Sequence, residues 1–211
     1  AFSPLFLIPK DSIAATSVTT QRATAVSMGS NNGPLRASIS WIDQRQVYTI
    51  PALVVLESAL FTLVCANLLL PSMHTLADSN LIEQHQPNIW AQVHKLLLLS
   101  GYYNYKLTGQ YNDAIASTVG FVPFDYNTQQ WADGKDWKWR AMAIRQEMLP
   151  EVLPAGSQLG EITTEAAAAT GIPVGLPLIA SGSDKACEVL GTGCIDSQTG
   201  SLSYGSLATL N

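Results

Sequence analysis

Hydrophobic and polar positions along the chain predict strands near its start and helices in its middle. Residues 13–26 are rich in Thr, Val and Ala, which is typical of a strand, a polar turn and a second strand. After a turn cluster at 30–36, residues 37–45 are expected to form another strand. Residues 52–70 and 88–106 carry apolar side chains at helical spacing, with Asn88 as the N-cap of the second helix.

The second half of the chain alternates turns, helices and strands. Its predicted elements are turn-rich segments at 107–113 and 122–139, a helix over 141–154, a strand-like start at 160–162, a helix from Thr164 to its cap at Gly171, a strand at 176–181, a helix at 184–190 and a hairpin that turns at Gly205. Strands followed by helices indicate a layered α/β or α+β fold.

The most hydrophobic segment, residues 50–73, is long enough to raise the question of a membrane span. Glu57 and Asn67 lie within it, Pro51 and Pro71 bound it, and its flanks lack a basic cluster. Membrane helices rarely carry an acidic residue and are usually anchored by basic ones. We therefore expect a core helix and no membrane partner.

Composition places the chain among soluble globular proteins and argues against a nucleic-acid partner. Its 211 residues are 47% hydrophobic and 13% charged, with a formal net charge of -5, whereas nucleic-acid-binding proteins usually carry a basic patch. The segment 131–140 interleaves tryptophans with basic residues, but its aspartates favour a structural loop over base stacking.

The cysteines and histidines suggest neither disulfides nor a zinc site. Cys65, Cys187 and Cys194 are odd in number and form no C-x-x-C motif, so we expect them to be reduced, mostly buried and in the cytoplasm. The three histidines are spaced too widely to share one helix face, and no metal ligand is assigned.

A carboxylate at the corner between the strand at 176–181 and the helix that follows is the first candidate for chemistry. Side chains at the carboxyl end of a strand face the crevice in which open α/β sheets bind ligands. Asp184 stands there and could accept a proton from a substrate hydroxyl. It could equally serve only as the N-cap of its helix, where aspartate is favoured.

Other polar corners accompany it. Gln21 and Arg22 lie at a strand end, Trp41 and Asp43 belong to "WIDQR" with Arg45, and "YGSLAT" holds a glycine-hydroxyl turn whose N–H groups could cradle a phosphate. An aromatic face beside planar polar groups suits a polyol, although Trp41 could be a core residue and Asp43–Arg45 a surface ion pair.

In order along the chain, "TTQRAT", "ISWIDQR", "KLLLLSGYYNYKLTGQYNDAIAS", "PAGSQLGEITTEAAAATGIPVGLPLIASGSDKACEVLGTG" and "SLSYGSLATLN" resemble the FGGY family of carbohydrate kinases. The resemblance implies an actin-like (ribonuclease H-like) ATPase fold with a mixed sheet and packed helices. It also implies that ATP and Mg2+ serve to phosphorylate a sugar or polyol hydroxyl.

The resemblance assigns roles to individual positions. Asp184 matches the family's catalytic base, and Lys185 lies beside it as a substrate-contacting candidate. The substrate-binding matches are Gln21, Arg22, Trp41 and Asp43, and the matches that approach the ATP phosphates are Gly205 and Ser206. Ala23 stands where glycerol kinases have glutamate, and Ser206 replaces the usual threonine.

Residues 1–211 are expected to form part of a substrate-binding first lobe, without the family's Asp-x-Gly-Thr phosphate hairpin and without the C-terminal nucleotide lobe. Because phosphoryl transfer depends on both lobes, such a fragment is expected to be inactive alone. The alternative is a non-catalytic sugar-binding or sensing module of the same fold. The expected partner is a small-molecule sugar or polyol, and a homodimer is left open.

Overall fold

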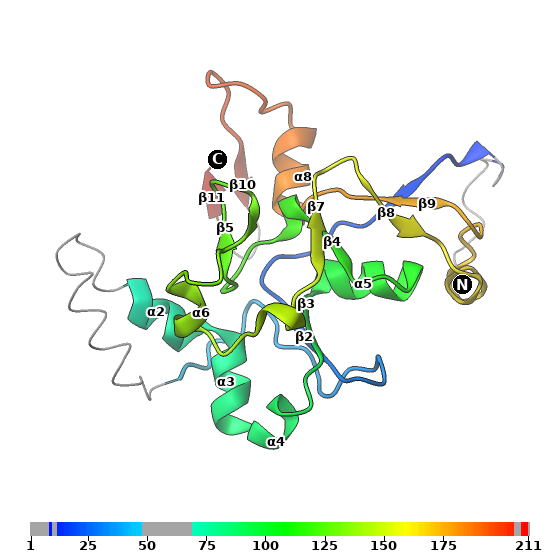
Figure 1. Cartoon of the computed structure of the whole chain (residues 1–211). Helices are drawn as coiled ribbons and strands as arrows, with labels where there is room; N and C mark the ends of the chain where they lie inside the picture. Colours follow the sequence, from blue (N-terminus) through cyan, green and yellow to red (C-terminus); the bar gives the residue numbers. More distant parts are fainter. Residues whose placement is uncertain (1–8, 10–11, 48–68, 205–207, 211) are drawn as a thin grey trace.

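The computed structural model describes residues 9, 12–47, 69–204 and 208–210 (Figure 1). Its helices are α2 (Leu69–Leu76), α3 (Asp78–His85), α4 (Pro87–Trp90), α5 (Leu99–Thr108), α6 (Lys138–Ala141), α7 (Thr164–Thr170) and α8 (Asp184–Gly191). Its strands are β1 (Thr16–Ser17), β2 (Ala25–Met28), β3 (Lys95–Leu98), β4 (Asn112–Ala114), β5 (Phe124–Asp125), β6 (Gln130–Trp131), β7 (Glu151–Leu153), β8 (Gln158–Glu161), β9 (Pro177–Ile179), β10 (Leu202–Tyr204) and β11 (Ala208–Leu210).

A three-stranded sheet of order β1-β9-β8 joins the start of the chain to its last third. β1 runs parallel to β9, with Thr16 opposite Leu178, while β8 pairs with β9 in the antiparallel sense. Leu178 and Leu159 are buried with Ala114 and Ala180 in a small apolar cluster under this sheet. Because β1 and β9 are parallel, their carboxyl ends open toward the same edge of the sheet.

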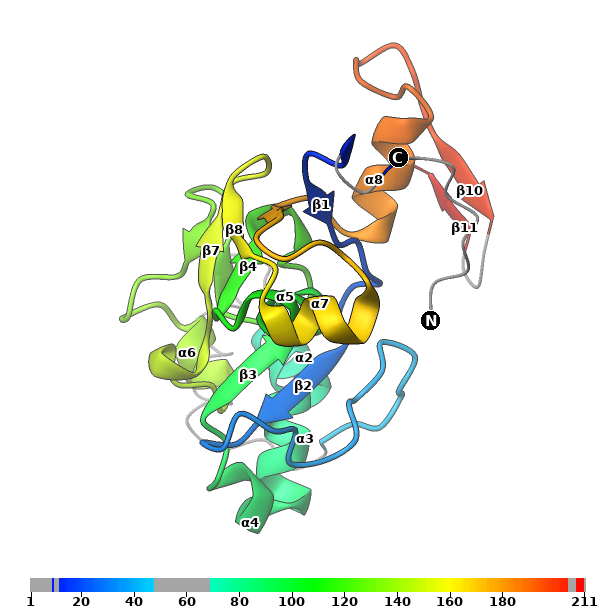
Figure 2. The same cartoon turned by 90° about the vertical axis from the view of Figure 1, so that its right-hand side faces the viewer.

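The larger core lies around the β2–β3 pair and the helices α3 and α4. β2 and β3 are antiparallel with Ala25 opposite Leu98, and α3 and α4 occupy the end of the molecule away from α8 and the β10–β11 hairpin (Figures 1 and 2). Ile39, Leu81, Trp90 and Phe124 are among the buried residues of this core. Two apolar cores thus flank the segment that leads from β1 to β2.

Much of the predicted order is confirmed. The strand-turn-strand pattern predicted over 13–26 appears as β1 and β2, the strand predicted over 176–181 appears as the shorter β9, and the turn at 30–36 and the helix from Asp184 are present. The helix α7 begins at Thr164 and is capped by Gly171, as predicted; Thr163 is its N-cap, and the φ of 81° at Gly171 is left-handed, as a glycine cap requires.

The helix predicted over 88–106 is wrong in its middle. The chain forms the short α4, which begins at Pro87 with Gln86 as its N-cap, then β3 at Lys95–Leu98, and only then α5. A run of leucines fits a buried strand as well as a helix, and pairing with β2 selects the strand. Asn88 is therefore not an N-cap.

Two other predicted elements are also wrong. Residues 141–154 form a short 3-10 helix at Gln146–Met148 and the strand β7 in place of a long helix, because Pro150 cannot continue a helix and β7 pairs with β4. The strand at 37–45 is reduced to one bridge between Ala25 and Ile39, after which the hydrogen bond from Asp43 N to Ser40 O (2.8 Å) closes a turn.

Most of the apolar segment 50–73, together with Cys65, Gly205 and Ser206, lies outside the described residues. Across the part of the chain that is described, no helix has the length and apolar character needed to cross a membrane. Cys187 and Cys194 are free thiols, as predicted, but they are half-buried and not core residues.

Candidate active site

The loops that leave the parallel ends of β1 and β9 are bonded to each other. Three hydrogen bonds join them, from Ser181 Oγ to Val18 O (2.6 Å), from Thr19 Oγ1 to Gly182 O (2.9 Å) and from Asp184 N to Thr20 O (2.9 Å). The backbone of Asp184 is therefore fixed beside the residue that precedes Gln21. Two predicted site residues that lie far apart in the sequence come together at this edge of the sheet.

The segment after β4 lies against both loops. Ser183 N donates to Ala116 O (3.2 Å), and Ala23 N donates to Val119 O (3.1 Å). Ala23 has a left-handed φ of 54°, and a Cβ atom on Gly120 would lie 3.3 Å from its Cα, so the two backbones approach closely. The ends of β1, β4 and β9 thus meet around the Gln21–Arg22 loop.

Asp184 occupies the first turn of α8 with an exposed side chain. Ser183 is the N-cap of this helix, and its hydroxyl accepts from Ala186 N (3.4 Å). Asp184 Oδ1 accepts from Lys185 N (2.7 Å), which orients the carboxylate at the positive end of the helix dipole. The capping role that the sequence allowed for Asp184 belongs to Ser183, and the Asp184 carboxylate is open to solvent.

Lys185 points into a different set of contacts. Its Nζ atom lies 2.5 Å from Glu188 Oε2 and 2.7 Å from Ser203 Oγ. This hydrogen bond from Lys185 lowers the pKa of Glu188. Lys185 thus ties α8 to the strand β10, which precedes the predicted nucleotide turn, and its contact with a substrate stays a prediction.

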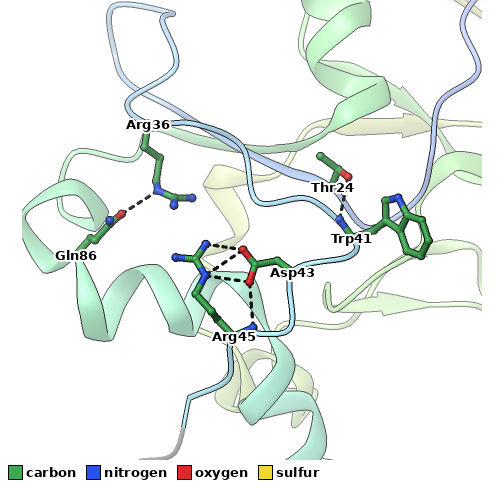
Figure 3. Close-up of polar contacts among 6 residues, drawn as sticks. All are labelled: Thr24, Arg36, Trp41, Asp43, Arg45 and Gln86. Carbon is green, nitrogen blue, oxygen red and sulfur yellow. Dashed lines mark hydrogen bonds and ion pairs between the residues drawn. The ribbon is translucent and has the colours of Figure 1, made fainter. Parts of the chain in front are cut away.

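Thr24 connects two of the predicted substrate-binding elements, and Figure 3 shows its contact with Trp41. Its side chain is buried, and its hydroxyl oxygen accepts from Gln21 Nε2 (2.9 Å) and from Trp41 N (3.3 Å). Arg22, two residues before Thr24, is exposed. Burial raises the pKa of Tyr126 and the positive charge of Arg22 opposes that rise, which indicates that Arg22 lies near Tyr126. The sequence analysis missed Thr24, although a polar residue at the start of an apolar strand was a signal.

Asp43 and Arg45 form the ion pair that the sequence suggested (Figure 3). Arg45 Nη2 lies 2.5 Å from Asp43 Oδ2, and Arg45 Nε lies 2.9 Å from Asp43 Oδ1. These hydrogen bonds lower the pKa of Asp43 to about 2. Trp41 points away from this pair, and its side chain remains 38% exposed, so it is not the core residue of the alternative interpretation.

A cavity of about 90 Å³ lies between β2, β3 and the segment after β4. Trp41, Asp43 and Arg45 line it, together with the aromatic residues Phe121 and Trp131. Asp184, Lys185, Gln21 and Arg22 are not part of its described wall. The predicted residues therefore form two neighbouring groups, the Asp184 corner and the Trp41 cavity, which the Gln21–Thr24 contact joins.

The same cavity is lined by Asp78, a residue that the sequence analysis also missed. Asp78 begins α3 after the N-cap Ala77 and is half-buried. Burial raises its pKa to about 7, and the negative charge of Asp43 adds to the rise, while Arg36 and Arg45 oppose it. No sequence motif marks this position, because the shift depends on how deeply the fold buries Asp78 and on the charges of Asp43, Arg36 and Arg45 near it.

The raised pKa of Asp78 predicts how stability depends on pH. Because the folded-state pKa of about 7 exceeds the ordinary aspartate value of 3.8, the folded state binds the proton more tightly than the unfolded state does. The contribution of Asp78 to stability is then greatest below about pH 4 and is lost as the pH rises toward about 7. Relative to the wild type, Asp78→Asn should therefore gain unfolding free energy between about pH 4 and pH 7.

Urea unfolding at several pH values checks this expectation. Glu83→Gln, which removes an exposed carboxylate from the same helix, is the matched control. Parallel pH curves for Asp78→Asn and the wild type would contradict the assigned shift.

The described residues offer no separate metal centre, since no three His, Cys, Asp or Glu side chains among them gather into a possible site.

The arms of the predicted nucleotide hairpin pair with Tyr204 opposite Ala208. Gly205 and Ser206 themselves lie between these arms and outside the described residues.

Known proteins share sequence with most of this chain. Residues 5–191 match the FGGY family of carbohydrate kinases, N-terminal domain. The chain is 39% identical over 118 residues to the uncharacterized sugar kinase YgcE of Escherichia coli, covering 53% of this chain and 22% of that protein. It is 27% identical over 173 residues to xylulose kinase of the same organism, covering 81% of this chain and 34% of the relative.

A solved structure shares the fold. Gluconate kinase from Lactobacillus acidophilus superposes with a TM-score of 0.73 at 20% identity, covering 94% of this chain and 40% of that one. The mixed α/β architecture of this chain is the actin-like fold of these kinases. The chain thus spans about a third or less of the two curated relatives and 40% of this structural neighbour. Since the family match covers most of its length, the chain belongs to the FGGY family of carbohydrate kinases, in the region of their N-terminal domain.

Proposed function

We propose that this chain carries the substrate pocket and the general base of an ATP-dependent kinase that phosphorylates a hydroxyl of a sugar or polyol. The observation that carries the proposal is the exposed carboxylate of Asp184, held one backbone hydrogen bond away from the Gln21–Arg22 loop (Asp184 N to Thr20 O, 2.9 Å). A catalytic base must reach the substrate, and this carboxylate is exposed, oriented and next to other groups that can bind hydroxyls.

In this proposal Asp184 takes the proton from the attacking hydroxyl as the phosphoryl group is transferred. The hydrogen bond from Lys185 N to Asp184 Oδ1 leaves the carboxylate with further acceptor capacity for that hydroxyl. Catalysis of phosphoryl transfer is mostly positioning and electrostatic stabilisation, so the remaining task of this chain is to hold the sugar still. Gln21, Arg22 and the indole of Trp41 are proposed to do this.

ATP with Mg2+ is proposed as the phosphoryl donor, as expected for a kinase of this family. Gly205 and Ser206 are the residues of this chain proposed to approach the phosphates. Because the chain spans only part of its relatives, the fragment alone is proposed to be inactive.

A coupled assay for ADP release tests the proposal. The full-length protein is assayed with ATP in the presence and absence of each member of a panel of pentuloses, hexonates and polyols. We expect ADP release that depends on the presence of one of these compounds. Thermal-shift measurements with sugar alone and with ATP and Mg2+ accompany it. Stabilisation by a sugar but never by ATP, without turnover, would instead indicate the non-catalytic sugar-binding module.

Trp41 gives a prediction specific to substrate binding. Its indole is 38% exposed and lines the cavity, so removing it should weaken sugar binding without unfolding the core. We expect Trp41→Ala to raise KM by roughly tenfold, since burying an aromatic side chain contributes on the order of 1.5–3 kcal/mol. Trp41→Phe, which keeps an apolar ring, should lose less.

Steady-state kinetics with the preferred sugar measures both variants. Exposed Tyr103 on α5 provides the control, and Tyr103→Ala should leave KM unchanged. Equal KM values for Trp41→Ala and the wild type would remove Trp41 from the sugar pocket.

A further inference from the structure

Among the described residues that line the Trp41 cavity, acidic side chains outnumber basic ones. Among the described residues that line it, the charged side chains are Asp43, Arg45, Asp78 and Asp113. The guanidinium of Arg45 is paired with Asp43, with its Nη2 atom 2.5 Å from Asp43 Oδ2. Of the four, the carboxyl groups of Asp78 and Asp113 therefore have no cation of this wall paired with them.

These two carboxyl groups differ in what they contact. Asp113 is 1% exposed, and its oxygens accept from Ser100 Oγ (2.8 Å), Ala114 N (2.8 Å) and Asn104 Nδ2 (3.2 Å). Its hydrogen-bonding capacity is occupied within the protein. Asp78 is half-buried. Within the described part of the chain its carboxyl group accepts no hydrogen bond, and burial and nearby charges alone shift its pKa.

An open carboxyl group on a cavity wall is expected to meet a partner when a ligand binds, because a buried polar group without a hydrogen bond is costly. A hydroxyl is a suitable partner, since it donates to a carboxylate and accepts from a protonated carboxyl group. A second carboxylate is a poor one, because like charges in contact at a binding site disfavour the complex strongly.

We propose that Asp78 is a specificity-determining residue of the sugar pocket, which hydrogen-bonds a hydroxyl of an uncharged sugar or polyol and discriminates against sugar acids. The proposal rests on the proposed function, because it takes the Trp41 cavity as the place where the sugar binds. Asp78 is a binding residue in this scheme and takes no part in proton transfer, which belongs to Asp184.

The electrostatic surroundings of Asp78 support this assignment. Burial and Asp43 raise its pKa to about 7, against the opposing charges of Arg36 and Arg45. Near neutral pH both forms of the carboxyl group are therefore present, and each of them can hydrogen-bond a neutral hydroxyl. Arg36 has a partner outside the cavity wall, since its Nε donates to Gln86 Oε1 (2.8 Å). A sugar acid bound beside Asp78 would thus find Arg45 as the cation on the described wall, and Arg45 is already paired with Asp43.

The test compares three ligands with the same number of carbons, D-xylulose, xylitol and D-xylonate, on the full-length protein. We measure kcat/KM for phosphorylation and the dissociation constant by calorimetry. For the wild type we expect xylonate to be at least about tenfold worse than the better neutral ligand. Asp78→Asn should reduce that ratio by several-fold, because the amide keeps hydrogen-bonding capacity and removes the charge.

Glu83→Gln is the matched control, since it removes one negative charge from the exposed part of α3 and should leave the ratio unchanged. The proposal is overturned if wild-type xylonate equals the neutral ligands, or if a folded Asp78→Asn variant keeps the wild-type ratio. Equal values for xylonate and the neutral ligands with the wild type would overturn the proposal even if Asp78→Asn does not fold. If none of a wider sugar panel is bound or phosphorylated, the proposed function fails and this inference fails with it, whereas turnover without discrimination overturns the inference alone.

Discussion

Asp184→Asn is expected to lower kcat by about 10²–10⁴-fold while the affinity for sugar changes little. The amide has nearly the same shape as the carboxylate and can still accept a hydrogen bond from Lys185 N, so the first turn of α8 should be kept. It cannot take a proton from the substrate hydroxyl. The loss should therefore appear in the chemical step, in a coupled assay for ADP release with the full-length protein.

Binding is measured separately, by calorimetry with sugar in the absence of ATP. Asp196→Asn is a suitable control, because it changes an exposed aspartate beyond α8 whose carboxylate, among the described residues, accepts from its own loop at Gln198 N and Thr199 Oγ1. If Asp184→Asn turns over at the wild-type rate, Asp184 is not the base. If it no longer binds sugar, its role is in binding and the assignment of proton transfer loses its support.

Asp113→Ala is expected to lower the unfolding free energy by about 2–4 kcal/mol. Asp113 links the end of β4 to the start of α5, where its carboxylate accepts from Ser100 Oγ (2.8 Å) and Asn104 Nδ2 (3.2 Å). Alanine would leave these buried donors, and Ala114 N, without their acceptor. Urea unfolding followed by circular dichroism measures the change, and a loss below about 0.5 kcal/mol would show that water replaces the carboxylate at little cost.

A companion variant, Asp113→Asn, separates the charge from the hydrogen bonds. Burial raises the pKa of Asp113 to about 6, while the hydrogen bonds from Ser100 and Ala114 oppose the rise. Since the folded-state pKa lies above the usual value of an aspartate, the contribution of Asp113 to wild-type stability falls as the pH rises from about 4 to 6. Asparagine does not titrate, so relative to the wild type its stability should improve over the same interval. If the difference in unfolding free energy between Asp113→Asn and the wild type stays constant over this interval, the raised pKa of Asp113 is contradicted.

The Asp184 corner could be predicted because its signals are local. A short apolar run followed by small residues and an acidic helix start is visible in the sequence, and β9 and α8 appear where it placed them. Even there, the choice of cap between Ser183 and Asp184 required coordinates, since both residue types are favoured at a helix start. The roles assigned to Asp184, Lys185, Gln21 and Arg22 stay predictions.

The errors occurred where distant partners decide the structure. Lys95–Leu98 became a strand because β2 was available to pair with it, and 151–153 became a strand because β4 was. Asp78 and Thr24 were missed for the same kind of reason. The importance of Thr24 arises from its hydrogen bond with Trp41 N, and that of Asp78 from burial and the charge of Asp43, and no spacing in the sequence around either residue indicates these effects.

The contact between Thr19 and Gly182 has a consequence for how the site forms during synthesis. The two residues are 163 positions apart, so the chain must be complete through α8 before the Gln21 loop can be held beside Asp184. Contacts between such distant residues form slowly, because the entropy of closing the loop is lost before the contact forms. Chains released before α8 is made would contain the β2–β3 pair and α5 but no assembled corner. The acquisition of sugar binding should therefore mark a late step of folding, after most of the helical signal has appeared.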